Sequence, residues 1–104
     1  MKQHQYQVNV KYLSDHEGNE VNQEITFSAP NHDNIFAIIE RTQQRDGFTL
    51  EMAQRFAVGL KLMTEVVMEH RDNPLFKELK PQIAEMMKII LRENRERLKI
   101  KKPR

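Results

Sequence analysis

The side chains best suited to chemistry are three neighbouring pairs of histidine and aspartate. They are Asp15–His16, His32–Asp33, and His70 with Asp72. Histidine titrates near neutral pH and binds metals, and a carboxylate can orient it or share the metal. A catalytic metal needs at least three converging protein ligands, and the spacing of these pairs does not force them together. Each pair also fits a turn, a helix start or a helix end. We therefore expect no metal site.

Other forms of catalysis find even less support in the sequence. The serines, Ser14 and Ser28, do not lie in a Gly-x-Ser-x-Gly turn. The three glycines are scattered singly, whereas phosphate-binding loops need them clustered. The absence of cysteine excludes disulfides, thiolate metal sites and cysteine nucleophiles. We expect no catalytic residue and no cofactor, with a small metal-binding or enzymatic protein as the least favoured alternative.

The formal charge of +2 conceals a basic C-terminus. From Arg92 onward the chain has seven basic and two acidic residues, so the preceding part is mildly acidic. A basic helical face could follow a phosphate backbone. Four side chains are the candidates for contact with a polyanion: Arg95, Lys99, Lys101 and Lys102. No aromatic residue lies among them for base stacking, and cations at a helix end also complement its dipole. A nucleic-acid-associated protein using this tail is the alternative function.

The N-terminal segment alternates between apolar and polar residues, which is typical of β-strands. The apolar positions are Tyr6, Val8, Val10 and Tyr12, followed after a turn by Val21, Ile25 and Phe27. Gly18 can supply the positive φ of the intervening turn. We predict an antiparallel hairpin whose apolar face packs on the helices, because an isolated hairpin is marginally stable. Its free edges favour pairing with a second copy, and hence a homodimer.

The rest of the chain has helical periodicity. Asn31 is expected to cap a first helix that Gly47 stops, and Thr49 to cap a second that ends near His70. The second helix should bury one stripe: Met52, Ala53, Phe56, Ala57, Leu60, Met63, Val66 and Val67. Asn73 and Pro74 should start a short helix. Pro81 is expected to interrupt it, and a last helix to begin there.

These elements predict an α+β fold, an N-terminal antiparallel β-hairpin followed by three to four α-helices in two layers. Residues 1–91 are expected to form a single domain and residues 92–104 a basic helical extension. No apolar run approaches the roughly 20 residues of a membrane span. The N-terminus also lacks the apolar core of a signal peptide. We expect a cytoplasmic protein that does not bind membranes.

Three stretches resemble a small, uncharacterised bacterial family catalogued as a domain of unknown function. They are residues 4–10, residues 31–41, and residues 59–62 continuing to 70–76. The similarity covers about residues 2–91. The resemblance implies a small α+β protein, and it supplies neither an activity nor a site residue.

The function favoured by these observations is a non-catalytic protein-interaction or regulatory module that self-associates. Tyr6 and Val8 on the first strand are candidates for association, as are Leu75 and Phe76. Leu75 and Phe76 form a bulky apolar pair in a segment between two prolines. Such a pair either fills a gap in the body or docks a partner, and we favour the first interpretation.

Overall fold

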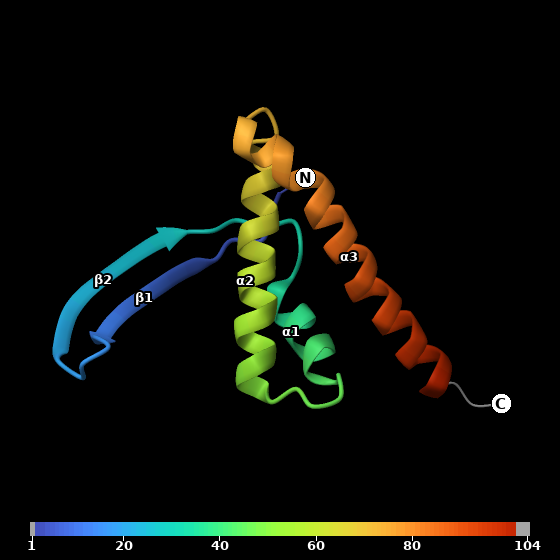
Figure 1. Ribbon diagram of the computed structural model, residues 1–104, viewed down its shortest axis with the longest axis horizontal. Helices are drawn as coiled ribbons and strands as arrows, with labels where there is room; N and C mark the ends of the chain where they lie inside the picture. The colour runs from blue at the N-terminus through green and yellow to red at the C-terminus, as the bar shows by residue number, and fades with distance from the viewer. Residues whose placement is uncertain (1, 102–104) are drawn as a thin grey trace. The chain divides into compact units, whose positions relative to one another are not determined.

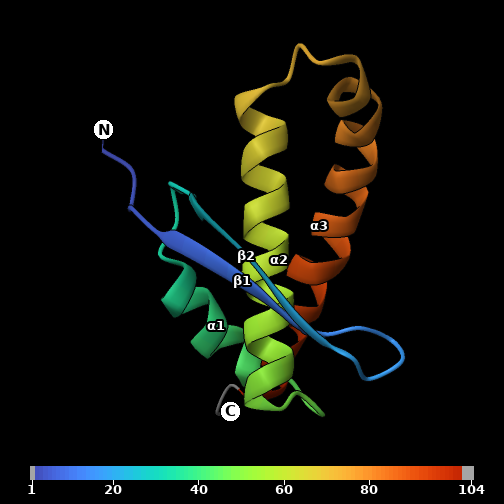
Figure 2. The same ribbon diagram turned by 90° about the vertical axis from the view of Figure 1, so that its left-hand side faces the viewer.

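The computed structural model describes the backbone of residues 2–101 and the side chains through Arg92. The elements are β1 (Gln7–Ser14), β2 (Glu20–Ser28), α1 (Ile35–Gln43), α2 (Leu50–Glu69) and α3 (Pro74–Lys101). This order of a hairpin and three helices confirms the α+β prediction (Figures 1 and 2). The chain divides into two compact units, residues 1–62 and 63–104, with the division inside α2.

β1 and β2 form the predicted antiparallel hairpin. Their register is regular from the Gln7–Ser28 pair to the Tyr12–Gln23 pair. Asp15 organises the turn, because its carboxylate accepts the backbone N–H groups of Glu17 (3.0 Å) and Asn19 (2.9 Å). Those bonds, with that from Asn19 foremost, lower the pKa of Asp15. Gly18 has a φ of 86°, which a residue with a side chain rarely adopts.

The hairpin is less covered than we expected. Val8 is half-buried, but Val10 and Ile25 are 50% and 60% exposed. Figure 1 shows the hairpin extending away from α1, with its turn at the far end. The expected packing on the helices is therefore wrong for this part of the apolar face. Alternation alone indicates which side chains share a face of a strand, and it cannot indicate what covers that face.

The N-cap of α1 lies three residues later than the predicted cap, Asn31. Asn34 is the N-cap, and its side chain accepts the N–H of Ala37 at 3.2 Å. The helix ends at Gln43, before Gly47, which has a φ of 79° in the following loop. Asn31 is instead buried in the segment that joins β2 to α1.

α2 has the expected limits and a narrower buried stripe. Thr49 caps it by accepting the N–H of Met52 at 3.2 Å. Ala53 and Ala57 are fully buried, whereas Met52 and Phe56 are more than 40% exposed. Val67 is buried as well, and Leu60 is half-buried, whereas Met63 and Val66 are exposed. Four of the larger residues of the predicted stripe therefore lie at its margin. The edge of the Phe56 ring contacts Phe48, with ring centroids 6.1 Å apart.

α3 is one helix where we predicted two. Asn73 caps it by accepting the N–H of Leu75 at 2.9 Å. Pro81 lies inside the helix and does not end it. A proline removes one N–H and crowds the carbonyl four residues earlier, which costs about 3 kcal/mol without forbidding a helix. The predicted interruption is therefore wrong, because the remaining helical bonds and the apolar stripe continue past it.

Candidate functional site

In two of the three histidine–aspartate pairs, the aspartate has a structural contact of its own, whereas His70 and Asp72 are exposed in the turn between α2 and α3. Asp15 bonds the hairpin turn, and the His16 ring beside it is almost fully exposed. Asp33 pairs with Lys61. No group of three or more potential metal ligands occurs among the described residues. These pairs therefore offer no assembled ligand set in the described part of the chain.

The polar cluster at the base of the hairpin begins with Tyr6. Its hydroxyl donates to the carbonyl of Asp33 (3.1 Å) and accepts the N–H of Ile35 (2.9 Å). The Tyr6 ring stacks against Phe36, with centroids 6.3 Å apart. One phenol thus ties the strand segment before β1 to the first residue of α1.

Asn31 is the most buried polar side chain of this cluster, at 1% exposure. Its amide nitrogen donates to the carbonyl of Lys61 (3.1 Å), and its side-chain oxygen accepts the N–H of Asp33 (3.0 Å). Its backbone N–H and carbonyl both pair with His4. Asn31 therefore holds together the N-terminal segment, the loop before α1 and α2. The sequence analysis missed this role, and the only local signal was an asparagine directly after Pro30.

An ion pair completes the cluster. Nζ of Lys61 lies 2.6 Å from Oδ2 of Asp33, and the lysine side chain is only 16% exposed. The hydrogen bond from Lys61 lowers the pKa of Asp33, and the charge of the ammonium acts in the same direction. We call Tyr6, Asn31, Asp33 and Lys61 the hairpin joint.

The buried polar side-chain atoms of the hairpin joint all have hydrogen-bond partners within the protein. No buried side-chain nitrogen or oxygen among the described residues lacks a hydrogen-bond partner. A ligand site normally presents polar groups that the protein itself leaves available. The joint is therefore a structural connection, and Tyr6 has its hydroxyl committed to it.

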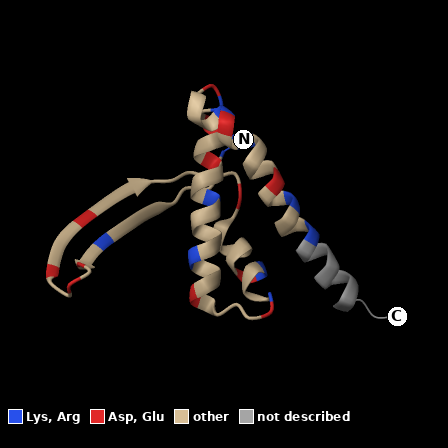
Figure 3. Ribbon diagram, in the orientation of Figure 1, with Lys and Arg blue, Asp and Glu red and all other residues tan. Residues whose placement is uncertain are grey.

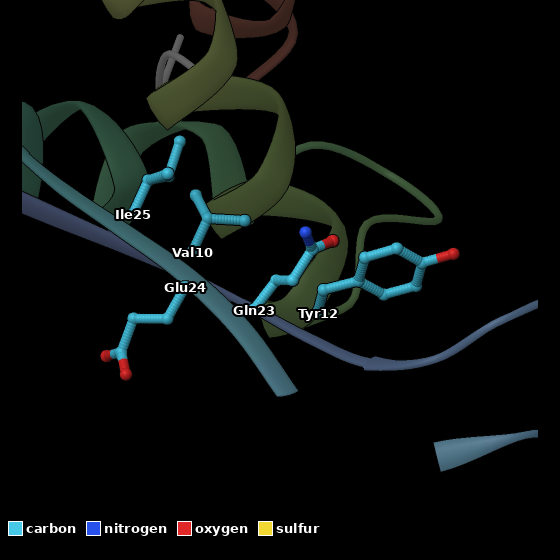
Figure 4. A pocket seen from close by; sticks show the side chains of 5 residues that line it. All are labelled: Val10, Tyr12, Gln23, Glu24 and Ile25. Atoms are coloured by element: carbon cyan, nitrogen blue, oxygen red, sulfur yellow. The ribbon is translucent and has the colours of Figure 1, made fainter. Parts of the chain in front are cut away.

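The apolar face of the hairpin has the opposite character. The residue pairs Val8–Phe27, Val10–Ile25 and Tyr12–Gln23 share this face. Beyond Val8, the apolar members are exposed: Val10, Tyr12, Ile25 and Phe27. Figure 4 shows Val10, Tyr12 and Ile25 on one side of the hairpin and Glu24 on the other. These residues and Gln23 line an open hollow of about 500 Å³. This exposed apolar face is the candidate association surface.

Leu75 and Phe76 lie in the first turn of α3. Leu75 is 57% exposed and Phe76 is half-buried. Phe76 also lines a polar hollow formed with residues 69–73. Phe76 is thus partly covered, whereas Leu75 is accessible. The role of the two residues in association stays a prediction.

The four basic candidates lie after Arg92, the last residue whose side chain the structure describes. Arg95, Lys99 and Lys101 belong to α3, but their side chains lie outside the described part, and Lys102 lies outside it entirely. Contact with a polyanion therefore stays a prediction. In the described part of the chain, no helix is both long and apolar enough to cross a membrane.

Comparison with known proteins identifies a family. A family model described as a domain of unknown function with a solved structure, DUF3861, matches residues 4–92. A crystal structure of a protein of unknown function from Pectobacterium atrosepticum is similar, with 31% identity and a TM-score of 0.74. The match covers 86% of this chain and 98% of that one. No protein with a curated description matches. The resemblance found in the sequence is thereby confirmed, and the chain belongs to the DUF3861 family.

Proposed function

We propose that this protein is a non-catalytic interaction module that forms a homodimer through its β-hairpin. The observation that carries the proposal is the exposure of the Val10–Ile25 pair at the centre of a regular two-stranded sheet. The proposal includes a cytoplasmic location. It also treats residues 1–91 as the folded domain and residues 92–104 as a basic extension.

Exposed apolar surface favours association. Burial is worth about 25 cal/mol per Å² of apolar surface removed from water. A two-stranded sheet also gains little stability by itself, and three or more strands with a covered face are normally needed. Association through the hairpin would add strands to the sheet and bring exposed apolar side chains of the two copies into contact.

Light scattering behind size exclusion tests the proposal with the full chain. We expect a mass of twice 12.4 kDa for the wild type. The double variant Val10→Thr with Ile25→Thr removes apolar surface from the candidate face and should shift the mass toward one chain.

Ile89→Thr is the matched control. Ile89 is also an exposed, β-branched side chain, but it lies on α3 and outside the hairpin. We expect it to leave the dimer intact. A wild type that remains monomeric at high micromolar concentration would refute the proposal.

The polyanion alternative is tested separately. Replacing Arg95, Lys99, Lys101 and Lys102 by glutamine should leave the dimer unchanged, because the proposed surface lies on the hairpin. Binding of wild type to a nucleic acid at low salt, lost in this variant and on adding salt, would favour the alternative.

A further inference from the structure

Each strand of the hairpin has one free edge. The N–H of Ala29 donates to the carbonyl of Tyr6, and His4 and Asn31 exchange both backbone bonds. In an antiparallel ladder such bonded pairs recur at every second residue. The inward-bonded residues of β1 are therefore Val8, Val10 and Tyr12, opposite Phe27, Ile25 and Gln23.

The remaining residues of β1 define its edge. By the same alternation, the backbone N–H and carbonyl groups of Gln7, Asn9, Lys11 and Leu13 point away from β2. No third strand joins the sheet among residues 2–101. β1 thus offers a row of unpaired donors and acceptors, which is a template for another strand.

The edge of β2 is less regular. Tyr12 pairs with Gln23 and Ser14 pairs with Glu20, so two residues of β2 lie opposite one residue, Leu13, of β1. The extra residue of this bulge is therefore in β2. Bulges bend and twist a strand, and proteins use them to discourage pairing at an edge.

The two strands also differ in charge. β1 carries one charged residue, Lys11, whereas β2 carries Glu20 and Glu24. Figure 3 shows one blue band on β1 and red bands on β2. Full overlap of β2 with β2 of a second copy would centre on Glu24 and place its two carboxylates opposite each other. Like charges in that position destabilise a sheet.

We infer that β1 pairs antiparallel with β1 of a second copy, around a two-fold axis that passes beside Val10. This inference rests on the proposed homodimer and adds its edge and register. The outward-bonding residues of both copies must face each other, so the axis passes through a residue and not between two. The register centred on Val10 overlaps residues 7–13 of each copy.

Neighbouring registers are less favourable. Centring on Lys11 would oppose the two ammonium groups. Centring on Asn9 shortens the overlap to residues 7–11. The Val10 register instead places Lys11 opposite neutral Asn9, and Val8 opposite Tyr12, on the polar and apolar faces respectively. It would form about eight backbone hydrogen bonds and one four-stranded sheet.

Single cysteines test the register in the full chain, which has none of its own. In the proposed dimer the two Val10 residues form a non-bonded pair with Cα atoms about 4.5 Å apart, within disulfide range. The two Ile25 residues lie three strand spacings apart, about 14 Å, and out of range. We therefore expect V10C to give at least about tenfold more disulfide-linked dimer than I25C under mild oxidation.

I25C is a matched control because Ile25 lies directly opposite Val10 on the same face and is similarly exposed. Cross-linking of I25C in place of V10C would assign the β2 edge and overturn the inference. Equal cross-linking of both variants, or of neither, in a protein that light scattering finds dimeric would also overturn it. A monomeric wild type would instead refute the proposed function itself.

A charge exchange gives an independent measurement of the register. Asn9→Lys would place a second cation opposite Lys11 of the other copy, and we expect a dissociation constant at least about tenfold higher. Adding Lys11→Gln to that variant should restore most of the affinity, because each new lysine then faces a neutral side chain and Glu24, opposite residue 11 in the hairpin, meets no second carboxylate. A dimer indifferent to Asn9→Lys, or a loss that Lys11→Gln does not restore, would contradict the Val10 register.

Discussion

The ammonium nitrogen of Lys61 lies 2.6 Å from Oδ2 of Asp33, and so links α2 to the loop before α1. The backbone carbonyl of the same lysine accepts a hydrogen bond from the side-chain amide of Asn31. One residue of α2 thus holds the loop by an ion pair and by a hydrogen bond. The hairpin is attached to the helices through this loop, so its position depends on the joint.

The Asp33–Lys61 ion pair makes stability depend on pH. The pKa of Asp33 is lowered in the folded protein, chiefly by the bond from Lys61. Its contribution is therefore present above the unfolded pKa of about 3.9 and is lost as pH falls through the lower folded value. Asp33→Asn removes it. Because Asp33 is half exposed, we expect a loss below about 1 kcal/mol at pH 7.

Urea denaturation at several pH values measures this effect. The stabilities of wild type and Asp33→Asn should converge as pH falls below about 4. Asp72→Asn, a substitution of an exposed aspartate in a turn, is the control and should parallel the wild type. A constant difference between Asp33→Asn and wild type down to pH 2 would exclude the titration of Asp33 as its cause.

Asn31→Ala should be the most damaging substitution in the hairpin joint. It removes the donor to the Lys61 carbonyl and the acceptor of the Asp33 N–H at a site that is 1% exposed. Leaving buried groups unsatisfied costs about 1–3 kcal/mol each. We expect a loss of about 2–4 kcal/mol in the free energy of unfolding by urea.

Asn34→Ala is the matched control for Asn31. Asn34 also bonds one backbone N–H, that of Ala37, but it is an exposed N-cap. Its loss should cost about 1 kcal/mol. Equal effects of the two substitutions would mean that the Lys61 contact of Asn31 adds nothing to stability.

Tyr6→Phe separates the hydroxyl of the joint from the ring. It deletes the bonds to Asp33 and Ile35 but keeps the stacking on Phe36. We expect a loss of about 1–2 kcal/mol in unfolding free energy, measured by chemical denaturation. The oligomeric state should not change, because the hydroxyl lies within one chain. Tyr12→Phe, on the exposed face, serves as the control, and a comparable loss there would refute the assignment.

The hairpin could be predicted from the sequence because strict alternation and a turn-forming segment are local signals. The caps at Thr49 and Asn73 were predicted for the same reason, since a cap bonds residues within one turn. The family, too, was recognised from short stretches of sequence. Structural features that a local sequence pattern encodes could therefore be predicted.

Contacts between segments that are distant in the sequence could not be predicted. Asparagine is a residue type favoured at helix caps. The burial of Asn31 follows instead from its contact with Lys61 of α2. Similarly, alternation placed Val10 and Ile25 on one face correctly but implied a cover that the structure lacks. Several large residues of the α2 stripe, such as Met52 and Phe56, are exposed although the pattern predicted them as core. Periodicity does not distinguish the centre of a buried stripe from its margin.

Pro81→Ala should stabilise the protein through its effect on α3. Pro81 lies inside α3 and supplies no N–H to the carbonyl of Lys77, which alanine would provide. Proline is about 3 kcal/mol less favourable than alanine within a helix. The less restricted unfolded chain offsets part of this gain. We therefore expect an increase of about 1–2 kcal/mol in unfolding free energy.

Gln82→Ala is the control, because Gln82 is an exposed neighbour of Pro81. It should change the unfolding free energy by less than about 0.5 kcal/mol. An unchanged or lowered stability of Pro81→Ala would show that the helix is adapted to a proline at this position.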